Sequence, residues 1–265
     1  MANGWKSFRR NTEAALRHAR LGHTGHARLQ QVLDCLTPHG CDVPLMRIGG
    51  GADGGYLLPD DLDGIAASFS PGVSDKMDFD LAVLERGIPS FLADASVPGL
   101  PQPHPLATFD PLFLGPRTEG QFISLDDWVA RYAPDTGDLL LQMDIEGAEY
   151  DTLAAASDET LGRFRILLVE FHGFHRMLSP KHLARMAPAL ERLARSHVVV
   201  HLHPNNASPL VHAGGLSLPP VFEAAFLRRD RAGEIGPPPP LPHPLDRPNV
   251  DGRPDFPMPR FWTGG

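Results

Sequence analysis

The chain has 265 residues, enough for one α/β domain with extensions and a sizeable apolar core. Its formal net charge of -8 argues against a general nucleic-acid-binding protein, and no apolar run is long enough to span a membrane. The start of the sequence lacks the apolar segment of a signal peptide, and Cys35 and Cys41 form neither a disulfide framework nor a metal knuckle, so we expect a cytoplasmic protein.

Residues 1–45 are predicted to form a basic helical extension. Within residues 1–28, six basic side chains face the single acid Glu13. The helical pattern continues to about Leu36 and ends before Pro38. We expect a solvated helix that packs on the core domain rather than a contact for a membrane or an acidic partner, and a lid over the functional site remains an alternative.

A glycine-rich loop follows at residues 47–56. Five glycines within nine residues allow its backbone to approach a ligand closely. It is not a P-loop, because no Gly-Lys-Ser/Thr follows, and not a dinucleotide fingerprint, because no strand is predicted before it and no helix after it. A plain turn is one interpretation, but the flanking Arg47 and Asp53 keep a ligand role open. The candidate cofactor-binding residues in this loop are Asp53, Gly54, Gly55 and Tyr56.

Strands and helices alternate in the core of the sequence. The predicted strands cover residues 64–70, 89–93, 106–114, 139–143, 165–172, 198–203 and 222–229, the last as an edge strand. The predicted helices cover residues 76–86, 125–130, 148–156 and 180–195, the second opened by a capping box at Ser124. This alternation predicts an α/β fold with a mostly parallel sheet. Asp94 ends the second strand, where an acid either accepts hydrogen bonds from ribose hydroxyls or only forms a turn.

Residues 138–151 combine a buried strand with two acids and a glycine. The apolar run at residues 139–141 indicates a strand that is buried on both faces, and Asp144, Glu146 and Gly147 follow it before a helix. Asp144 is therefore predicted at the carboxyl end of a central strand, where open α/β sheets bind their ligands. Either acid alone is also explained as a helix cap, whereas the pair with its glycine favours a functional site.

Polar side chains recur at the ends of the next predicted strands. Glu170 and His172 end one strand, and His201 and His203 end another before the asparagines at 205–206. Because the carboxyl ends of parallel strands share one edge, these donors are expected to converge there. Such a set suits Mg, Mn or Fe(II) better than a closed zinc site. For each single histidine, a ring that bonds to backbone in the core is the alternative.

Residues 233–265 are too rich in proline for a regular helix or sheet. Interleaved apolar side chains predict a tail that packs back on the domain, and a proline-rich ligand for another protein is the alternative. The remaining residues, 46–232, are predicted to form the central domain.

Four sequence blocks resemble the FkbM-type S-adenosylmethionine-dependent methyltransferases. They lie at residues 47–56, 142–150, 164–172 and 201–206, with an echo at 245–249. The resemblance implies a Rossmann-like class I methyltransferase sandwich. Its seven-stranded sheet would be mostly parallel with an antiparallel last strand, residues 197–203 and 221–228 being the last pair.

The resemblance also implies roles for single residues. The turn at residues 70–75 would be the cofactor loop, with Gly72, Val73 and Ser74 at S-adenosyl-L-methionine and Asp94 at its ribose. This loop departs from the Gly-x-Gly-x-Gly that many methyltransferases have after the first strand. Asp144 would act near the methyl group.

The implied reaction is O-methyl transfer to a hydroxyl of a sugar, glycan or natural product. Mg or Mn held by Asp144, Glu170 and His172 would lower the pKa of that hydroxyl, and His172 or His203 is the general base if no metal takes part. We expect a small-molecule or glycan acceptor and no nucleic-acid partner, and a homo-oligomer is left open. Two other classes compete: a metal-dependent hydrolase or oxygenase that uses the same edge, and a non-catalytic binding module.

Overall fold

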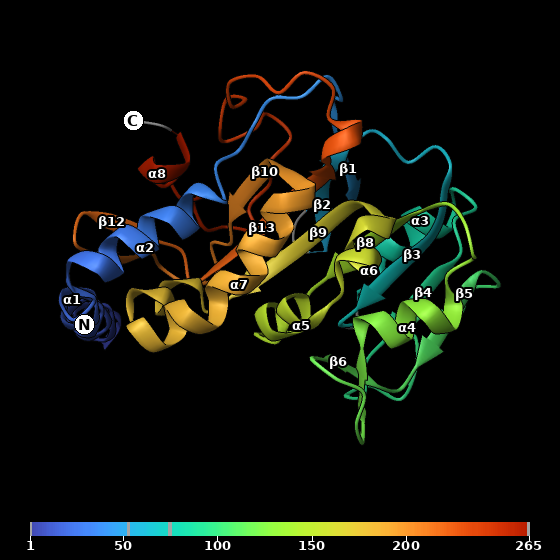
Figure 1. Cartoon of the computed structure of the whole chain (residues 1–265), viewed down its shortest axis with the longest axis horizontal. Coiled ribbons are helices and arrows are strands. Elements are labelled where there is room, and N and C mark those ends of the chain that lie inside the picture. Colours follow the sequence, from blue (N-terminus) through green and yellow to red (C-terminus); the bar gives the residue numbers. More distant parts are fainter. Residues whose placement is uncertain (1, 52–53, 74–75, 264–265) are drawn as a thin grey trace.

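The computed structural model describes residues 2–51, 54–73 and 76–263. In this part of the chain, seven strands form the main sheet (Figure 1). Their spatial order is β10 (His197–Pro204), β13 (Val221–Arg228), β9 (Phe164–His172), β8 (Asp138–Met143), β3 (Ile65–Pro71), β4 (Ser90–Ala93) and β5 (Ala107–Asp110). All pairs from β9 to β5 are parallel, while β13 is antiparallel to both of its neighbours. The predicted Rossmann-like fold class is confirmed.

The position of β13 corrects the prediction of an edge strand at residues 222–229. β13 lies between β9 and β10 and hydrogen-bonds to both, so β10 forms the edge of the sheet. The residues of β13 from Phe222 to Leu227 are buried accordingly. The order of the strands along the sequence does not reveal that β13 inserts between β9 and β10, because strand pairing depends on contacts between residues far apart in sequence.

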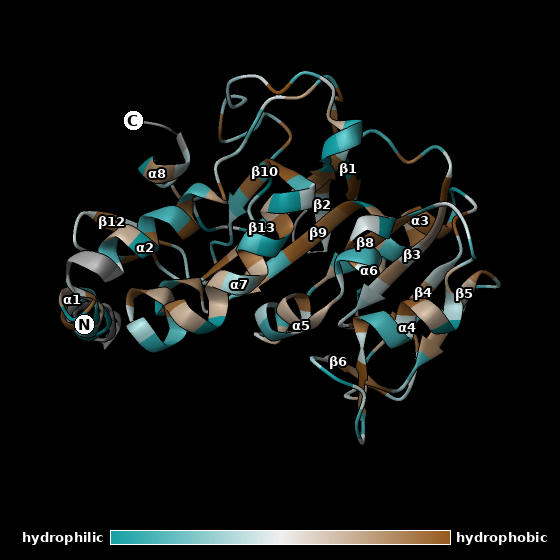
Figure 2. Cartoon of the chain, in the orientation of Figure 1, coloured by the Kyte–Doolittle hydropathy of each residue, from teal (hydrophilic) through white to brown (hydrophobic). Residues whose placement is uncertain are grey.

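β8 and β9 form as strands because their apolar side chains alternate between two cores. Leu139 and Leu141 belong to the cluster on one face of the sheet, and Leu140 belongs to the cluster on the other. β9 alternates in the same way. Figure 2 shows these strands as a hydrophobic centre with hydrophilic positions on the outer helices. The prediction of a strand buried on both faces is therefore confirmed for β8.

Helices cover one face of the sheet, and a hairpin with one helix covers the other (Figure 1). The first group is α2 (Gly22–Asp34), α4 (Leu125–Tyr132), α5 (Glu149–Ala155), α6 (Asp158–Arg163) and α7 (Pro180–Ser196). The second is α3 (Asp78–Leu84) with the antiparallel pair β1 (Leu45–Gly49) and β2 (Gly55–Pro59). The predicted cap of α4 is present, since the Asp127 amide donates to Ser124 Oγ at 3.1 Å.

The glycine-rich loop joins β1 to β2, so the prediction that no strand precedes it is wrong. No helix follows it, as predicted, and the chain instead turns back on itself as a hairpin. The hairpin requires glycine at position 55, because a Cβ there would lie 2.0 Å from the carbonyl oxygen of Gly50.

Two further predicted elements divide in the structure. The N-terminal helix is interrupted at Gly22, whose φ of 64° separates α1 (Ala2–Ala19) from α2. The strand predicted at residues 106–114 breaks at Pro111, which cannot donate to a sheet. Its first part is β5, and its second, β6 (Phe113–Gly115), pairs with β7 (Phe122–Ser124) outside the main sheet.

The C-terminal residues contact the domain through an aromatic cluster. Trp262, in α8 (Arg260–Thr263), is 1% exposed and packs against Phe222 of β13 and Phe174. Phe174 begins the 3₁₀ helix η1 (Phe174–Leu178), which precedes α7. Two shorter elements complete the description, the hairpin of β11 (Val211–Ala213) and β12 (Leu216–Leu218) and the 3₁₀ helix η2 (Arg229–Arg231). None of the described helices has both the length and the apolar character needed to cross a bilayer.

Candidate functional site

The turn after β8 is held against the turn after β3. Gly72 has φ of 93°, and a Cβ on it would lie 1.6 Å from the carbonyl oxygen of Asp144. Only glycine fits between the two backbones. In the same turn Glu146 has φ of 55°, an uncommon conformation for a residue with a side chain, which occurs preferentially at functional sites. The sequence thus fixes Asp144 at the carboxyl end of the sheet, as predicted.

Glu149 organises this turn from the first helical position of α5. Its side chain is fully buried, and its Oε1 accepts hydrogen bonds from the amides of Ile145 at 3.2 Å and Gly147 at 2.9 Å. The same oxygen accepts from Nδ1 of His172 at 3.1 Å. Within the described ranges, Oε2 of Glu149 is buried without a hydrogen-bond partner.

His172 brings three carboxylates together at the end of β9. Besides its bond to Glu149, its Nε2 lies 3.4 Å from Glu146 Oε2 and 3.8 Å from Asp144 Oδ1. Burial alone lowers the pKa of His172, but the hydrogen bond to Glu149 and the surrounding carboxylates raise it to about 9. At neutral pH the ring is therefore mainly an imidazolium, which donates protons and hydrogen bonds rather than accepting them.

Asp144, Glu149 and His172 form a candidate metal group. Each offers one ligand atom, and these atoms all lie within 4.8 Å of one another. The prediction named Asp144 and His172 but had Glu170 in place of Glu149. An acid at the start of a helix is usually explained as a dipole partner, so the sequence carried only a weak signal for Glu149.

Glu170 lies next to this group and lines a cavity. Its Oε1 accepts a hydrogen bond from Asn205 Nδ2 at 2.8 Å. Burial raises its pKa well above the usual range, and the nearby carboxylates of Asp144 and Glu223 raise it further. Glu170 is therefore an acid that is driven toward its neutral form.

Several of these side chains line one cavity of about 360 Å³, here called the acidic cavity. Asp144, Glu170 and His172 line it, as do Gly54 and Tyr56 of the β1–β2 hairpin. The sequence predicts both hairpin residues at the cofactor, and in the structure both line this cavity, which also contains Gly72 of the predicted cofactor loop.

Asp80 of α3 also lines the acidic cavity. Its side chain is only 8% exposed, and burial raises its pKa to about 6. Beside it, Ser70 Oγ donates to Gln142 Oε1 at 2.7 Å, and Gln142 Nε2 donates to Tyr56 Oη at 3.2 Å. The cavity is thus lined by hydrogen-bonding groups, several of them acidic. Nothing in the sequence distinguishes Asp80 as a site residue, since acids in the first turn of a helix are common.

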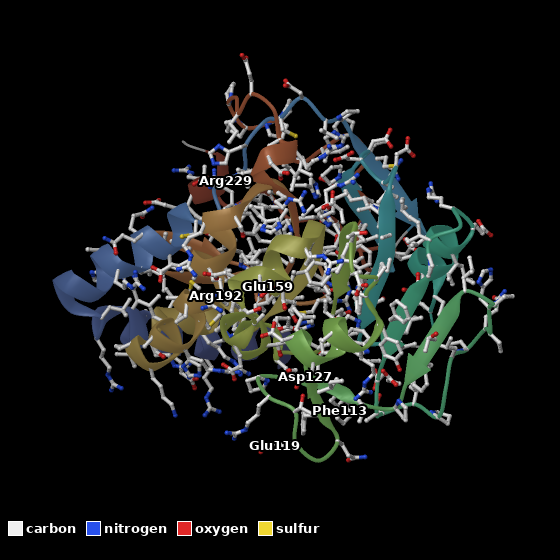
Figure 3. The ribbon with its side chains drawn as sticks, turned by 45° about the vertical axis from the view of Figure 1, so that its right-hand side comes forward. Phe113, Glu119, Asp127, Glu159, Arg192 and Arg229 are labelled. Atoms are coloured by element: carbon white, nitrogen blue, oxygen red, sulfur yellow. The ribbon has the colours of Figure 1, made fainter. Side chains whose placement is uncertain are left out.

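A second cavity of about 490 Å³, here called the apolar cavity, lies at the ends of β3 and β4. Val73 and Asp94 line it, and Asp94 Oδ1 accepts a hydrogen bond from the Ser96 amide at 2.7 Å. Phe113 and Phe122 of the β6–β7 pair, with ring centroids 5.7 Å apart, line its other side. Figure 3 labels Phe113 near the loop that carries Glu119 away from the body of the domain.

The two cavities are both lined by Gly72, Asp144 and Glu146. They therefore meet at the turns after β3 and β8. The predicted residues Gly72, Val73, Asp94, Asp144, Glu170 and His172 all line one or both of them.

His203 is not brought to this site among the described residues. Its Nε2 donates to Asp255 at 2.9 Å, and its Nδ1 lies 3.9 Å from Glu223. Because β13 separates β10 from β9, His203 lies on a strand about 10 Å from the strand of His172, given the usual strand spacing. Asp53 and Ser74 lie outside the residues that the structure describes.

Residues 113–195 match the family model described as Methyltransferase FkbM domain. The predicted resemblance is therefore confirmed over this part of the chain, which includes Asp144, Glu149 and His172. The strands β3 and β4, which are followed directly by Gly72 and Asp94, precede the matched residues. Among curated proteins, none matches the chain.

Proposed function

Since residues 113–195 carry an FkbM methyltransferase domain, we propose that the protein is an S-adenosylmethionine-dependent O-methyltransferase for a hydroxyl of a sugar, glycan or natural product. The observation that supports this best is the meeting of the apolar and acidic cavities at Gly72, Asp144 and Glu146. A cofactor and a polar acceptor bound in the two cavities would approach each other there.

The apolar cavity has the chemistry that the cofactor needs. Val73, Phe113 and Ile145 line it and offer apolar surface to an adenine ring. Asp94 is at the end of β4, where a carboxylate can accept hydrogen bonds from ribose hydroxyls. The absence of a Cβ at Gly72 lets the backbone approach a ligand. When bound, S-adenosylmethionine supplies an electrophilic methyl group.

Asp144 is the group that we propose to act on the acceptor. It lines both cavities, and its carboxylate can accept a hydrogen bond from the acceptor hydroxyl and orient an oxygen lone pair. His172 supports this role by holding the carboxylates of Glu149 and Glu146 beside it. Because methyl transfer is an in-line displacement, the main contribution of these residues is to align the reactants.

A metal-assisted form of the reaction is supported by the donor set of Asp144, Glu149 and His172. Two carboxylates and one imidazole suit Mg or Mn, and the partnerless Oε2 of Glu149 is the kind of buried atom that a cation would satisfy. A cation held there would lower the pKa of the acceptor hydroxyl. Without a cation, the His172–Glu149 hydrogen bond and the 3.8 Å approach of His172 Nε2 to Asp144 Oδ1 hold the same three residues together.

Titration calorimetry with S-adenosylhomocysteine tests the cofactor site first. We expect one-to-one binding, weakened about tenfold in Asp94→Ala because the lost carboxylate would leave the ribose hydroxyls without an acceptor. Addition of a chelator, and then of Mg or Mn, separates the metal-assisted form from the metal-free form. Absence of binding by the folded protein under every condition would contradict the proposal.

Methyl transfer from labelled cofactor to a panel of sugars and glycans tests Asp144. Asp144→Asn should lower kcat by at least about 100-fold while S-adenosylhomocysteine binding changes little, because the substitution removes the charge near the reacting hydroxyl. Asp158→Asn, at an exposed acid that begins α6, is the matched control. An Asp144→Asn protein with normal turnover would exclude the assigned role.

A further inference from the structure

A third cavity of about 290 Å³ adjoins the acidic cavity on the side of η1 and α7. The two are both lined by Glu146, His172 and Val221. The acidic cavity and the third cavity are therefore direct neighbours, separated by these three residues at most.

The third cavity, here called the basic cavity, has the opposite charge. Arg176, His175, His182 and Arg185 line it. Arg185 is neutralised by Asp151, since its Nη2 lies 2.7 Å from Asp151 Oδ2. Arg176 is exposed in η1, and within the described ranges no carboxylate lies within ion-pair distance of it. Glu146 also lines the cavity, but its side chain is 86% exposed and so remains largely hydrated.

The basic N-terminal helix strengthens the positive potential at this cavity. α1 contacts η1 and contributes Arg10 and Arg17 near His175. Burial lowers the pKa of His175, and the charges of Arg10, Arg176 and Arg17 lower it further, to about 4. Arg10, Arg17 and Arg176 thus lie close enough to His175 for their charges to act on its ring.

Two buried polar atoms at the cavity have no partner among the residues that the structure describes. Tyr150 is 1% exposed, lines the cavity, and its hydroxyl makes no hydrogen bond. The Nδ1 of His175 is likewise buried without a partner. Because buried polar groups are nearly always hydrogen-bonded, a hydroxyl that lacks an acceptor in a cavity that is also lined by Arg176 indicates a site for a hydrogen-bond acceptor with negative charge.

We propose that the basic cavity binds an oxyanion carried by the acceptor, while the acidic cavity receives its hydroxyl-bearing part. Arg176 supplies the charge, and the hydroxyl of Tyr150 donates a hydrogen bond. The oxyanion is a phosphate ester or a carboxylate, so the acceptor class is an acidic sugar or glycan rather than a neutral one. This inference rests on the proposed methyl transfer, which it refines by naming the acceptor class.

Binding of inorganic phosphate to the whole chain, measured by calorimetry in a phosphate-free buffer, tests the site without any turnover. We expect one phosphate per chain, with affinity lowered about tenfold in Arg176→Gln and several-fold in Tyr150→Phe, because a charged and a neutral hydrogen bond are lost. Arg195→Gln, at an exposed arginine near the end of α7, is the matched control and should bind as the unaltered protein does. Thermal unfolding verifies that each variant is folded.

Competition then identifies the oxyanion. Displacement of phosphate by glucose 6-phosphate assigns a phosphate ester, and displacement by glucuronate assigns a carboxylate. Equal displacement by glucose, or displacement by none of the three sugars, overturns the inference about the acceptor. Absence of phosphate binding, or binding that neither variant weakens, overturns the site itself. A parallel titration with S-adenosylhomocysteine distinguishes these outcomes from a failure of the proposed methyltransferase function.

Discussion

Asp80 is expected to destabilise the folded protein at neutral pH. Its carboxyl group is buried in α3 at the acidic cavity, and within the described ranges its Oδ1 has no hydrogen-bond partner. Burial raises its pKa from 3.8 to about 6, since the charged form loses its hydration. Asp80→Asn keeps the shape of the side chain and removes the charge.

The size of the effect follows from the two pKa values. Above about pH 6 the group is charged in both the folded and the unfolded protein, and the difference between 6 and 3.8 corresponds to about 3 kcal/mol lost from the free energy of unfolding. In Asp80→Asn the side-chain amide hydrogen-bonds less strongly than the carboxylate does, mainly with Ser70, and this loss cancels about 1 kcal/mol of the gain in stability. We therefore expect Asp80→Asn to be more stable by about 2 kcal/mol at pH 7.

Because the pKa of Asp80 is higher in the folded than in the unfolded protein, the gain in stability should depend on pH. Below the unfolded-state pKa of 3.8 the carboxyl is neutral in both states and its cost vanishes, so the gain should shrink as the pH falls from about 7 to about 4. Urea unfolding of both proteins over this range measures it. Asp78→Asn, at an exposed acid in the same helical turn, is the control and should lose a few tenths of a kcal/mol through the helix dipole.

An Asp80→Asn protein that is no more stable at neutral pH would refute the argument, as would a gain of the same size at every pH. A confirmed gain would have a functional meaning. An acid that is retained at a cavity despite its cost in stability is expected to serve the ligand, so methyl transfer should fall in the stabilised variant.

Three further predictions concern Gly72, the ion pairs of Asp138 and the buried ring of His197. Gly72→Ala should weaken S-adenosylhomocysteine binding at least about tenfold in calorimetry, because its Cβ would meet the Asp144 carbonyl and displace the loop; unchanged affinity would contradict this. Asp138→Asn should lower the free energy of unfolding in urea by about 2 kcal/mol, since it removes the carboxylate that lies 2.8 Å from Arg165 and 2.6 Å from Arg228, while Asp61 still pairs with Arg165; a loss below about 0.5 kcal/mol would contradict this. Burial lowers the pKa of His197 to about 4, so below about pH 6.5 only the unfolded state takes up a proton on this ring. Between about pH 7 and pH 5 the free energy of unfolding should therefore fall by about 2 kcal/mol, a loss that His197→Gln should not show. Parallel profiles of the free energy of unfolding against pH for the two proteins would contradict this.

The central strands and the position of Asp144 could be predicted from the sequence because local signals determine them. The run at residues 139–141 is apolar on both faces, and the acids and the glycine mark where β8 ends. His172 was predictable for the same reason, as the polar end of a buried strand. The capping of α4 by Ser124 also followed from a spacing of a few residues.

The remaining features depend on long-range contacts and could not be read locally. Glu149 resembles an ordinary acid at a helix start, and only the fold brings its carboxylate to His172. His203 resembles His172 in sequence, but the insertion of β13 places it elsewhere. The basic cavity is equally hidden in the sequence, since α5, η1 and α7 contribute to it from separate segments.

The insertion of β13 has a consequence for how the chain folds during synthesis. β9 is complete at residue 172 and β10 at residue 204, yet β13, which pairs with both strands and lies between them in the sheet, ends only at residue 228. While these residues are being made, β9 presents an edge with unpaired amides and carbonyls and with apolar side chains on both faces. Substitutions that weaken β13 are therefore expected to reduce the yield of native protein through aggregation of the nascent chain. Substitutions at Ala224 or Ala225, which line none of the three cavities described above, should leave the turnover of the molecules that do fold unchanged.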